Sequence, residues 1–293
     1  MSFESRLLRH PGRPDPERIE SIEGAARTLA FDVAAGLNLR DAIVGPLKAA
    51  GIEGATVRID GLRLQALHFV RPAPPQDDLH VAFYSDPHAI HEPVTLHTVC
   101  ATVGRRDGAP FVHCHALWIG PDGVERGGHL HTDQVVVAEP AHAQAWGLAN
   151  AIMQSEPDEE TNFTLFRPVP VEVAASAAKP AGGRRSVLAR IRPNVDLLEG
   201  IEQVCSRHGF AAATVRGSIG SIVGARFEDG RRVDDVATEI LVLRGEVRPG
   251  PEGGRTDMEI ALIDPRGDVH KGRLARGENP VLICFELVLE EAA

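Results

Sequence analysis

The sequence is poor in aromatic side chains, which make up 4% of its residues and include a single tyrosine. Its hydrophobic cores must therefore be built mainly from valine, leucine, isoleucine and alanine. The four cysteines lie far apart and form no C-x-x-C pair, at Cys100, Cys114, Cys205 and Cys284. Buried free thiols in a reducing cytoplasm are the simplest interpretation of this spacing.

Positive charge is also scarce, with 31 Lys and Arg residues against 41 Asp and Glu residues. The net charge of −10 argues against nucleic acid as a partner, because polyanion binding needs clustered cations. No apolar run approaches the roughly 20 residues of a membrane span, and residues 1–18 lack the apolar segment of a signal peptide. We therefore expect a cytoplasmic protein with no membrane partner.

The most informative stretch is Phe111–Thr132, FVHCHALWIGPDGVERGGHLHT. In a β-strand, His113 and His115 point to the same face. A Pro-Asp-Gly turn follows, and the two glycines before His129 let the backbone pass close to a neighbour. An H-x-H pair alone is more often a polar strand face. The combination instead predicts a hairpin that brings three imidazoles together, as in a divalent metal site with an open coordination position.

The stretch FVHCHALWIGPDGVERGGHL also resembles the signature of the plant and prokaryote conserved (PPC, or PCC) domain family, in which an H-x-H strand precedes a turn and G-G-H-L. The resemblance implies an α/β (α+β) fold with a mixed, mostly antiparallel sheet and flanking helices, and commonly a homotrimer. In some prokaryotic members the motif histidines bind a metal, which here implies His113, His115 and His129. Plant members carry AT-hooks and bind DNA, and the family has no single established activity.

The second half of the chain repeats the first. Leu39–Arg58 aligns with Leu197–Arg216 through a shared Ala-Thr-Val-Arg, and WIGPDGVERGGHL aligns with LIDPRGDVHKGRL. The first half has extra residues between these blocks, which we place around 72–92. We therefore predict two tandem PPC-like domains. Their bounds are an N-terminal arm at 1–22, a domain with the three-histidine motif at 23–173, a linker at 174–185 and a degenerate domain at 186–293.

Local patterns predict the elements of the first half. Leu39–Ala50 has helical spacing, with Asn38 as N-cap and Gly51 as the stop. Ala141–Met153 is interpreted as a second helix. Alternating apolar residues predict strands, at 27–33, 55–59, 62–69, 95–104, 135–138 and 164–168.

The second copy does not preserve the histidines. In the alignment Asp257 replaces His113, Glu259 replaces His115, and Arg273 replaces His129. A divalent cation there would meet the positive charge of Arg273. Arg273 is instead expected to pair with the two carboxylates. This predicts one metal ion per chain and a second copy that is mainly structural.

Other side chains have weaker claims to the site. His131 follows His129 on the same predicted face and is a candidate catalytic base, ligand or solvated histidine. Arg58 recurs as Arg216 and is a candidate substrate-binding residue, although structural pairing fits a repeated arginine better. Zinc is the favoured ion. Each histidine that binds the ion should donate a hydrogen bond from its other ring nitrogen to a carboxylate or carbonyl. The candidate carboxylates are Asp133, Glu125 and Glu139.

Three classes of function remain. The first is a metal-dependent hydrolase or lyase acting on a small polar, carboxylate-type molecule. The second is a non-catalytic regulatory module that binds a metal or metabolite and whose site controls assembly. For assembly itself, the resemblance implies a trimer, and the alternative is that the second copy takes the place of a partner subunit. DNA binding ranks last, because Pro11 stands where an AT-hook needs its first arginine.

Overall fold

The computed structural model describes residues 3–172, 184–250 and 253–292. It is mostly β, with 59% strand, and the described residues contain two α-helices. The strands pair antiparallel, apart from a short parallel contact between β8 (Val94–Arg106) and β12 (Ala151–Pro157). The predicted antiparallel sheet is therefore confirmed, whereas the predicted α/β class overstates the helical content. No helix in this part of the chain is long and apolar enough to cross a membrane.

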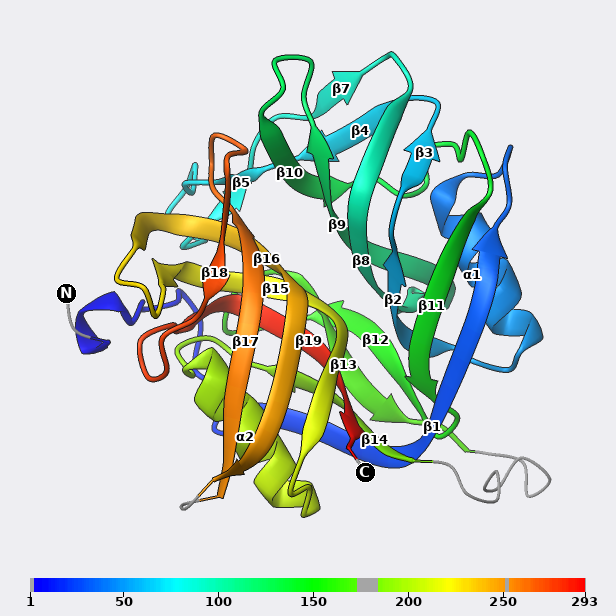
Figure 1. The fold of residues 1–293 in the computed structure, drawn as a ribbon. Coiled ribbons are helices and arrows are strands. Elements are labelled where there is room, and N and C mark those ends of the chain that lie inside the picture. Colours follow the sequence, from blue (N-terminus) through cyan, green and yellow to red (C-terminus); the bar gives the residue numbers. More distant parts are fainter. Residues whose placement is uncertain (1–2, 173–183, 251–252, 293) are drawn as a thin grey trace.

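The first half forms a curved sheet covered by helix α1 (Leu39–Ala49) (Figure 1). Asn38 caps the helix as predicted, because its side chain accepts a hydrogen bond from the backbone N–H of Asp41. The buried face of α1 includes Leu39, Ile43 and Leu47, which join the core of this half. The main strands are β2 (Gly54–Ile59), β3 (Leu62–Leu64), β4 (Leu67–Val70), β7 (His88–Ile90), β8, β9 (Ala109–Ile119), β10 (Glu125–Leu130) and β11 (Ala141–Leu148).

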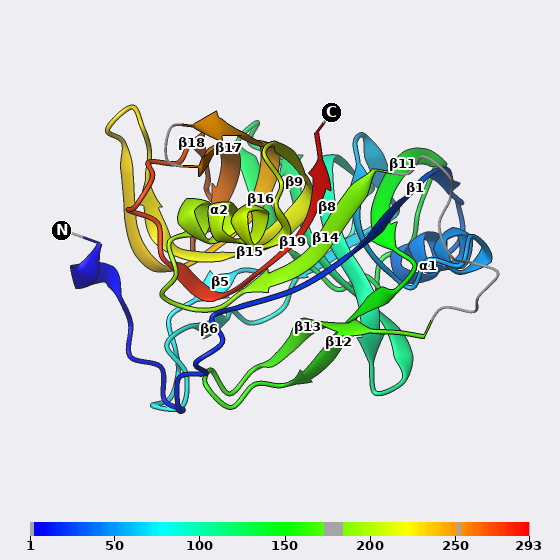
Figure 2. The ribbon, with the colours of Figure 1, turned by 90° about the horizontal axis from the view of Figure 1, so that it is seen from below.

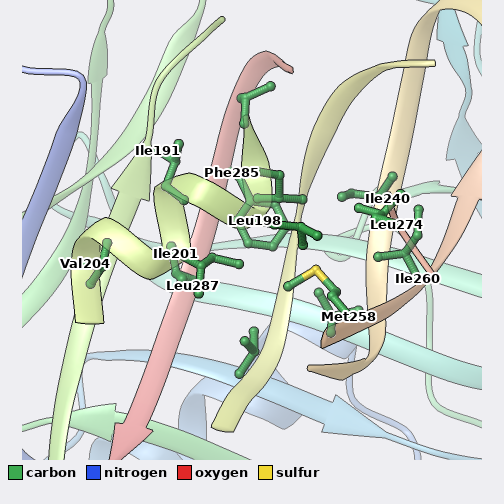
Figure 3. Packing of buried hydrophobic residues seen from close by; sticks show 14 of the residues in the cluster. Ile191, Leu198, Ile201, Val204, Ile240, Met258, Ile260, Leu274, Phe285 and Leu287 are labelled. Carbon is green, nitrogen blue, oxygen red and sulfur yellow. The ribbon is translucent and has the colours of Figure 1, made fainter. Parts of the chain in front are cut away.

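The second half has its own sheet and its own helix, α2 (Leu197–His208). In Figure 3, Leu198, Ile201 and Val204 of α2 lie over apolar side chains of this sheet, among them Phe285 and Met258. These residues belong to one buried cluster, so the second half has a core separate from that of the first. Its strands are β14 (Arg185–Ile191), β15 (Ala213–Arg226), β16 (Arg232–Gly250), β17 (Gly253–Ile263), β18 (Val269–Arg273) and β19 (Val281–Glu291).

One long strand, β1 (Ile19–Val33), joins the two halves (Figure 2). Its residues 19–25 pair with β14, and its residues 26–33 pair with β11. The sequence predicted only the second part of this strand. Residues preceding β1 are docked on the second half, where Leu8 and Asn194 exchange two hydrogen bonds. A 3₁₀ turn, Glu4–Arg6, lies within this N-terminal segment.

The helix predicted at Ala141–Met153 is wrong. These residues form β11 and the start of β12, which pairs with β13 (Thr164–Pro170). In β11, Ala143 and Ala145 are buried while His142 and Gln144 are exposed, which is the two-residue alternation of a strand. Pairing of β11 with both β1 and β2 determines its conformation. Most of the predicted linker, at 174–183, lies outside the described residues.

The segment around 72–92 carries two short paired strands, β5 (Pro72–Ala73) and β6 (Phe83–Tyr84). Its aromatic side chains gather with Phe163, whose ring centroid lies 5.8 Å from that of Phe83 and 6.4 Å from that of Tyr84. This segment brings the only tyrosine of the chain beside the histidine motif, because the Tyr84 and His129 ring centroids are 5.1 Å apart.

Candidate metal centre

The predicted histidine hairpin is confirmed. Strand β9 carries His113 and His115, and strand β10 returns antiparallel with His129 directly opposite His115. One nitrogen of each ring lies within 4.8 Å of the others. The three side chains are buried or half-buried and lie between the two halves of the molecule.

The glycines before His129 are required by close packing. A Cβ on Gly127 would lie 2.5 Å from Ile263 Cγ1 in the second half. A Cβ on Gly128 would lie 2.7 Å from Phe69 Cδ2 and 2.9 Å from the Val70 carbonyl oxygen. Strand β10 therefore fits between β4 and β17 only without side chains at these positions.

Hydrogen bonds from the second half determine how two of the imidazoles are oriented. His113 Nδ1 donates to the Glu286 carboxylate at 3.0 Å, and His115 Nδ1 donates to the Ile240 carbonyl oxygen at 2.9 Å. Neutral rings with the proton on Nδ1 present lone pairs at Nε2, and the two Nε2 atoms are 3.1 Å apart. A cation between these lone pairs would remove their repulsion. This is the arrangement of metal-ligating histidines supported by a carboxylate or carbonyl.

A second buried carboxylate, that of Glu239 on β16, lies beside His115 and His129. Its Oε1 is 3.3 Å from His115 Nε2 and 3.5 Å from His129 Nδ1. Among the described residues, Glu239 Oε2 and His129 Nδ1 are buried without a hydrogen-bond partner. Such unpartnered groups are costly in a protein interior, so both atoms fit a site that is completed by an ion or a ligand.

The pKa values show how the charges balance. Burial opposes ionisation of Glu239 and Glu286, but the neighbouring histidines outweigh burial and lower the pKa of both carboxyls. Burial lowers the pKa of His129 to about 4. Burial also acts to lower the pKa of His115, but Glu239 outweighs it and raises this pKa. Two buried carboxylates thus need compensating positive charge, which either imidazolium or a divalent ion supplies.

Sequence reasoning missed both carboxylates. Two of the expected partners lie elsewhere: Glu125 is 2.7 Å from His97 Nε2 and 2.6 Å from Lys271 Nζ, and Glu139 is 3.5 Å from Arg63. The third, Asp133, lines a cavity together with His113 and His129. Glu239 and Glu286 are the acidic residues within the apolar runs ATEILVL and LICFELVL. A charged residue inside a buried strand is the signal that would have identified them.

Two adjoining cavities open on the histidines. The larger, about 350 Å³, is lined by His113, His129, His131 and Arg106, among others. The smaller, about 60 Å³, reaches His113, His115 and Glu239 and is otherwise lined mainly by apolar side chains. Tyr84 lines both. Burial raises the pKa of its phenol well above the ordinary value, so this hydroxyl stays protonated.

The remaining sequence candidates are placed as follows. His131 lines the larger cavity but is not part of the three-nitrogen group. Arg58 lies away from both cavities, 3.1 Å from Asp60 and 3.2 Å from the Leu243 carbonyl oxygen. Its counterpart Arg216 lies 2.7 Å from Glu290.

The corresponding hairpin of the second half has the same register but different chemistry. Glu259 on β17 faces Arg273 on β18, as His115 faces His129. The turns also correspond, with Gly123 at φ 77° and Gly267 at φ 81°. Arg273 pairs with Asp257 at 3.1 Å and is half exposed. In the described part of the chain, the histidine group is the one cluster with metal-ligand geometry.

Comparison with known families identifies the second half. Residues 178–293 match the Plants and Prokaryotes Conserved (PCC) domain, so the chain carries a PCC domain over this range. The match lies over the half that sequence reasoning interpreted as the degenerate copy, not over the histidine stretch that first suggested the family. The curated proteins include no significant match to this chain.

Several solved structures resemble about half of the chain. One is described as a metal-containing protein from Archaeoglobus fulgidus, with 22% identity and a TM-score of 0.39, covering 50% of this chain and 96% of that one. Another is a plant- and prokaryote-conserved (PPC) protein from Pyrococcus horikoshii, with 21% identity and a TM-score of 0.37, covering 52% of this chain and 96% of that one.

Proposed function

We propose that this protein binds one divalent metal ion through His113, His115 and His129 and uses it to bind and act on a small carboxylate-type molecule. The observation that carries the proposal is the convergence of three ring nitrogens within 4.8 Å, supported by two buried carboxylates. Zinc is the ion we favour, because three imidazoles and an open position suit it. Zinc bound there would supply Lewis acidity and a water of pKa about 7.

The side chains around the ion have separate roles. Glu286 and the Ile240 carbonyl would hold the proton on Nδ1 of His113 and His115, which leaves Nε2 free to bind the ion. Glu239, which lines the smaller cavity, would balance the charge of the ion. His131, on the wall of the larger cavity, is the candidate base. This chemistry is that of a metal-dependent hydrolase or lyase.

A non-catalytic regulatory module is the second candidate. It is favoured by the position of the site, because Glu239 and Glu286 come from the second half while the histidines come from the first. Metal binding would therefore stabilise the contact between the halves as well as each half separately. Turnover of a small carboxylic acid or its derivatives would distinguish the enzyme from the module.

Further proposals concern copy number and assembly. The shared hairpin register supports a tandem duplication in which the second copy lost its metal and holds the Arg273–Asp257 pair instead. We keep the homotrimer as a proposal, to be tested by sedimentation, and we place the protein in the cytoplasm. DNA binding remains the least favoured function because of the net charge of −10.

Metal analysis of protein purified without a histidine tag tests the proposal. We expect about one zinc or similar ion per chain, lost in His113→Ala and in His129→Ala. His142→Ala is the matched control, because His142 is exposed on β11 and contacts Asp32 rather than the cluster. Absence of metal from the correctly folded wild type after incubation with zinc would refute the metal centre, and two equivalents would refute the single site.

A further inference from the structure

We propose that the larger cavity is a carboxylate-binding subsite in which Arg106 holds the acid group of a short-chain monocarboxylic acid. The proposal rests on the proposed function and deepens it, because it names the substrate class and the residue that recognises it. Arg106 stands at the end of β8 and lines the same cavity as His113 and His129.

Arg106 is positioned by contacts that leave its charge available. Its guanidinium lies 3.7 Å from the centroid of the Phe111 ring, and its Nε donates to Ser155 Oγ at 3.1 Å. Its neighbour on the strand, Arg105, pairs with Glu53. Within the described ranges, Arg106 has no carboxylate at ion-pair distance. A guanidinium fixed by stacking and one hydrogen bond still presents a planar fork that matches a carboxylate.

The other charged side chains of the cavity favour a single negative charge on the ligand. Arg40 pairs with Asp41 at 3.0 Å, which leaves Arg106 as the better anion partner. Asp133 and Glu286 line the same cavity and add negative charge. A polyanion would meet this repulsion, whereas one carboxylate can pair with Arg106.

The smaller cavity indicates what the rest of the ligand looks like. It meets the larger one at shared lining residues, including Tyr84 and His113, and its walls include Phe83, Leu282 and Ile283. A cavity needs roughly 10–15 Å³ to hold one water molecule, so a cavity of about 60 Å³ has room for a short apolar tail. Glu239 also lines this cavity, and its carboxylate would repel a second carboxylate placed there.

The subsite is tested by calorimetric titration of butyrate into zinc-loaded and metal-stripped protein. We expect butyrate to bind, with butyramide and succinate each binding at least about tenfold more weakly, because the first lacks the charge and the second carries one too many. Arg106→Gln should weaken butyrate binding at least about tenfold, and Arg106→Lys should retain part of it, because lysine keeps the charge but not the fork. Arg105→Gln is the matched control and should bind butyrate like the wild type.

The outcomes separate the subsite from the metal centre. Equal butyrate affinity in wild type and Arg106→Gln, with unchanged zinc content and circular dichroism, overturns the subsite and leaves the metal centre standing. Absence of butyrate binding in both forms of the wild type overturns it as well. If zinc does not bind, the metal centre fails, but an Arg106-dependent preference for butyrate over butyramide in metal-free protein still supports the subsite. Should Arg106→Gln not fold, the comparison of the three ligands on the wild type decides.

Discussion

Replacing Glu286 by glutamine should weaken metal binding without destabilising the metal-free protein. The Glu286 carboxylate, from the second half, accepts a hydrogen bond from His113 Nδ1 at an N···O distance of 3.0 Å. Glutamine keeps the shape and an acceptor oxygen but removes the charge. The substitution therefore isolates the electrostatic support that one half of the chain gives to the histidines of the other.

The magnitude follows from distance and charge. A divalent ion on Nε2 of His113 would lie roughly 6 Å from the carboxylate, which at an effective dielectric of about 20 corresponds to an attraction of about 5 kcal/mol. The amide dipole and local relaxation recover part of this. Loss of a carboxylate supporting a metal histidine commonly weakens affinity by about 10- to 100-fold, and we expect this range for Glu286→Gln.

The metal-free protein should respond differently. Glu286 is almost fully buried, so its carboxylate carries a desolvation penalty that glutamine does not. We expect the free energy of unfolding of metal-free Glu286→Gln to lie within about 1 kcal/mol of the wild type, since the lost charge-assisted hydrogen bond and the relieved desolvation oppose each other.

Competition with a chromophoric chelator measures the zinc affinity, and urea unfolding measures the stability. Glu290→Gln is the control, because Glu290 is buried on the same strand but pairs with Arg184 and Arg216 instead of a histidine. It should lose stability and keep zinc affinity. Wild-type zinc affinity in Glu286→Gln would refute the inference that the second half supports the metal centre.

Two further substitutions test the packing and the ion pairs. Gly128→Ala should lower the free energy of unfolding in urea by about 1–3 kcal/mol, because its Cβ would overlap the Val70 carbonyl oxygen. An unchanged free energy of unfolding would contradict the packing argument. Asp158→Asn should cost about 3 kcal/mol, because it removes a buried carboxylate held by Arg190 and Arg192. Burial opposes ionisation of Asp158, but the two arginines outweigh it and lower its pKa. Its stabilising contribution is therefore complete above the unfolded pKa of about 3.9 and is lost as pH falls through the folded pKa. Acid unfolding curves should accordingly converge for wild type and variant at low pH, and a constant gap down to pH 2 would contradict this assignment.

Local sequence determined the parts of the protein that depend on neighbouring residues. Alternation placed His113 and His115 on one strand face, and the Pro-Asp-Gly turn returned His129 to them. Asn38 caps its helix because capping is a contact between residues three apart. Repetition of the hairpin pattern also aligned Glu259 with His115 and Arg273 with His129, and Glu259 and Arg273 face each other in the register of β17 and β18 as the two histidines do in β9 and β10.

Tertiary structure decided what depends on distant segments. Ala141–Leu148 is a strand because β1 and β2 supply backbone partners on both sides, which its alanine-rich composition does not reveal. The division of β1 between the two sheets has no local signature. Glu239 and Glu286 lie more than a hundred residues along the chain from the histidines. They contact the histidines only because the two halves pack together. The periodicity of a sequence indicates which face of a strand or helix is buried. Only the packing of distant segments determines which charged side chain lies against that face.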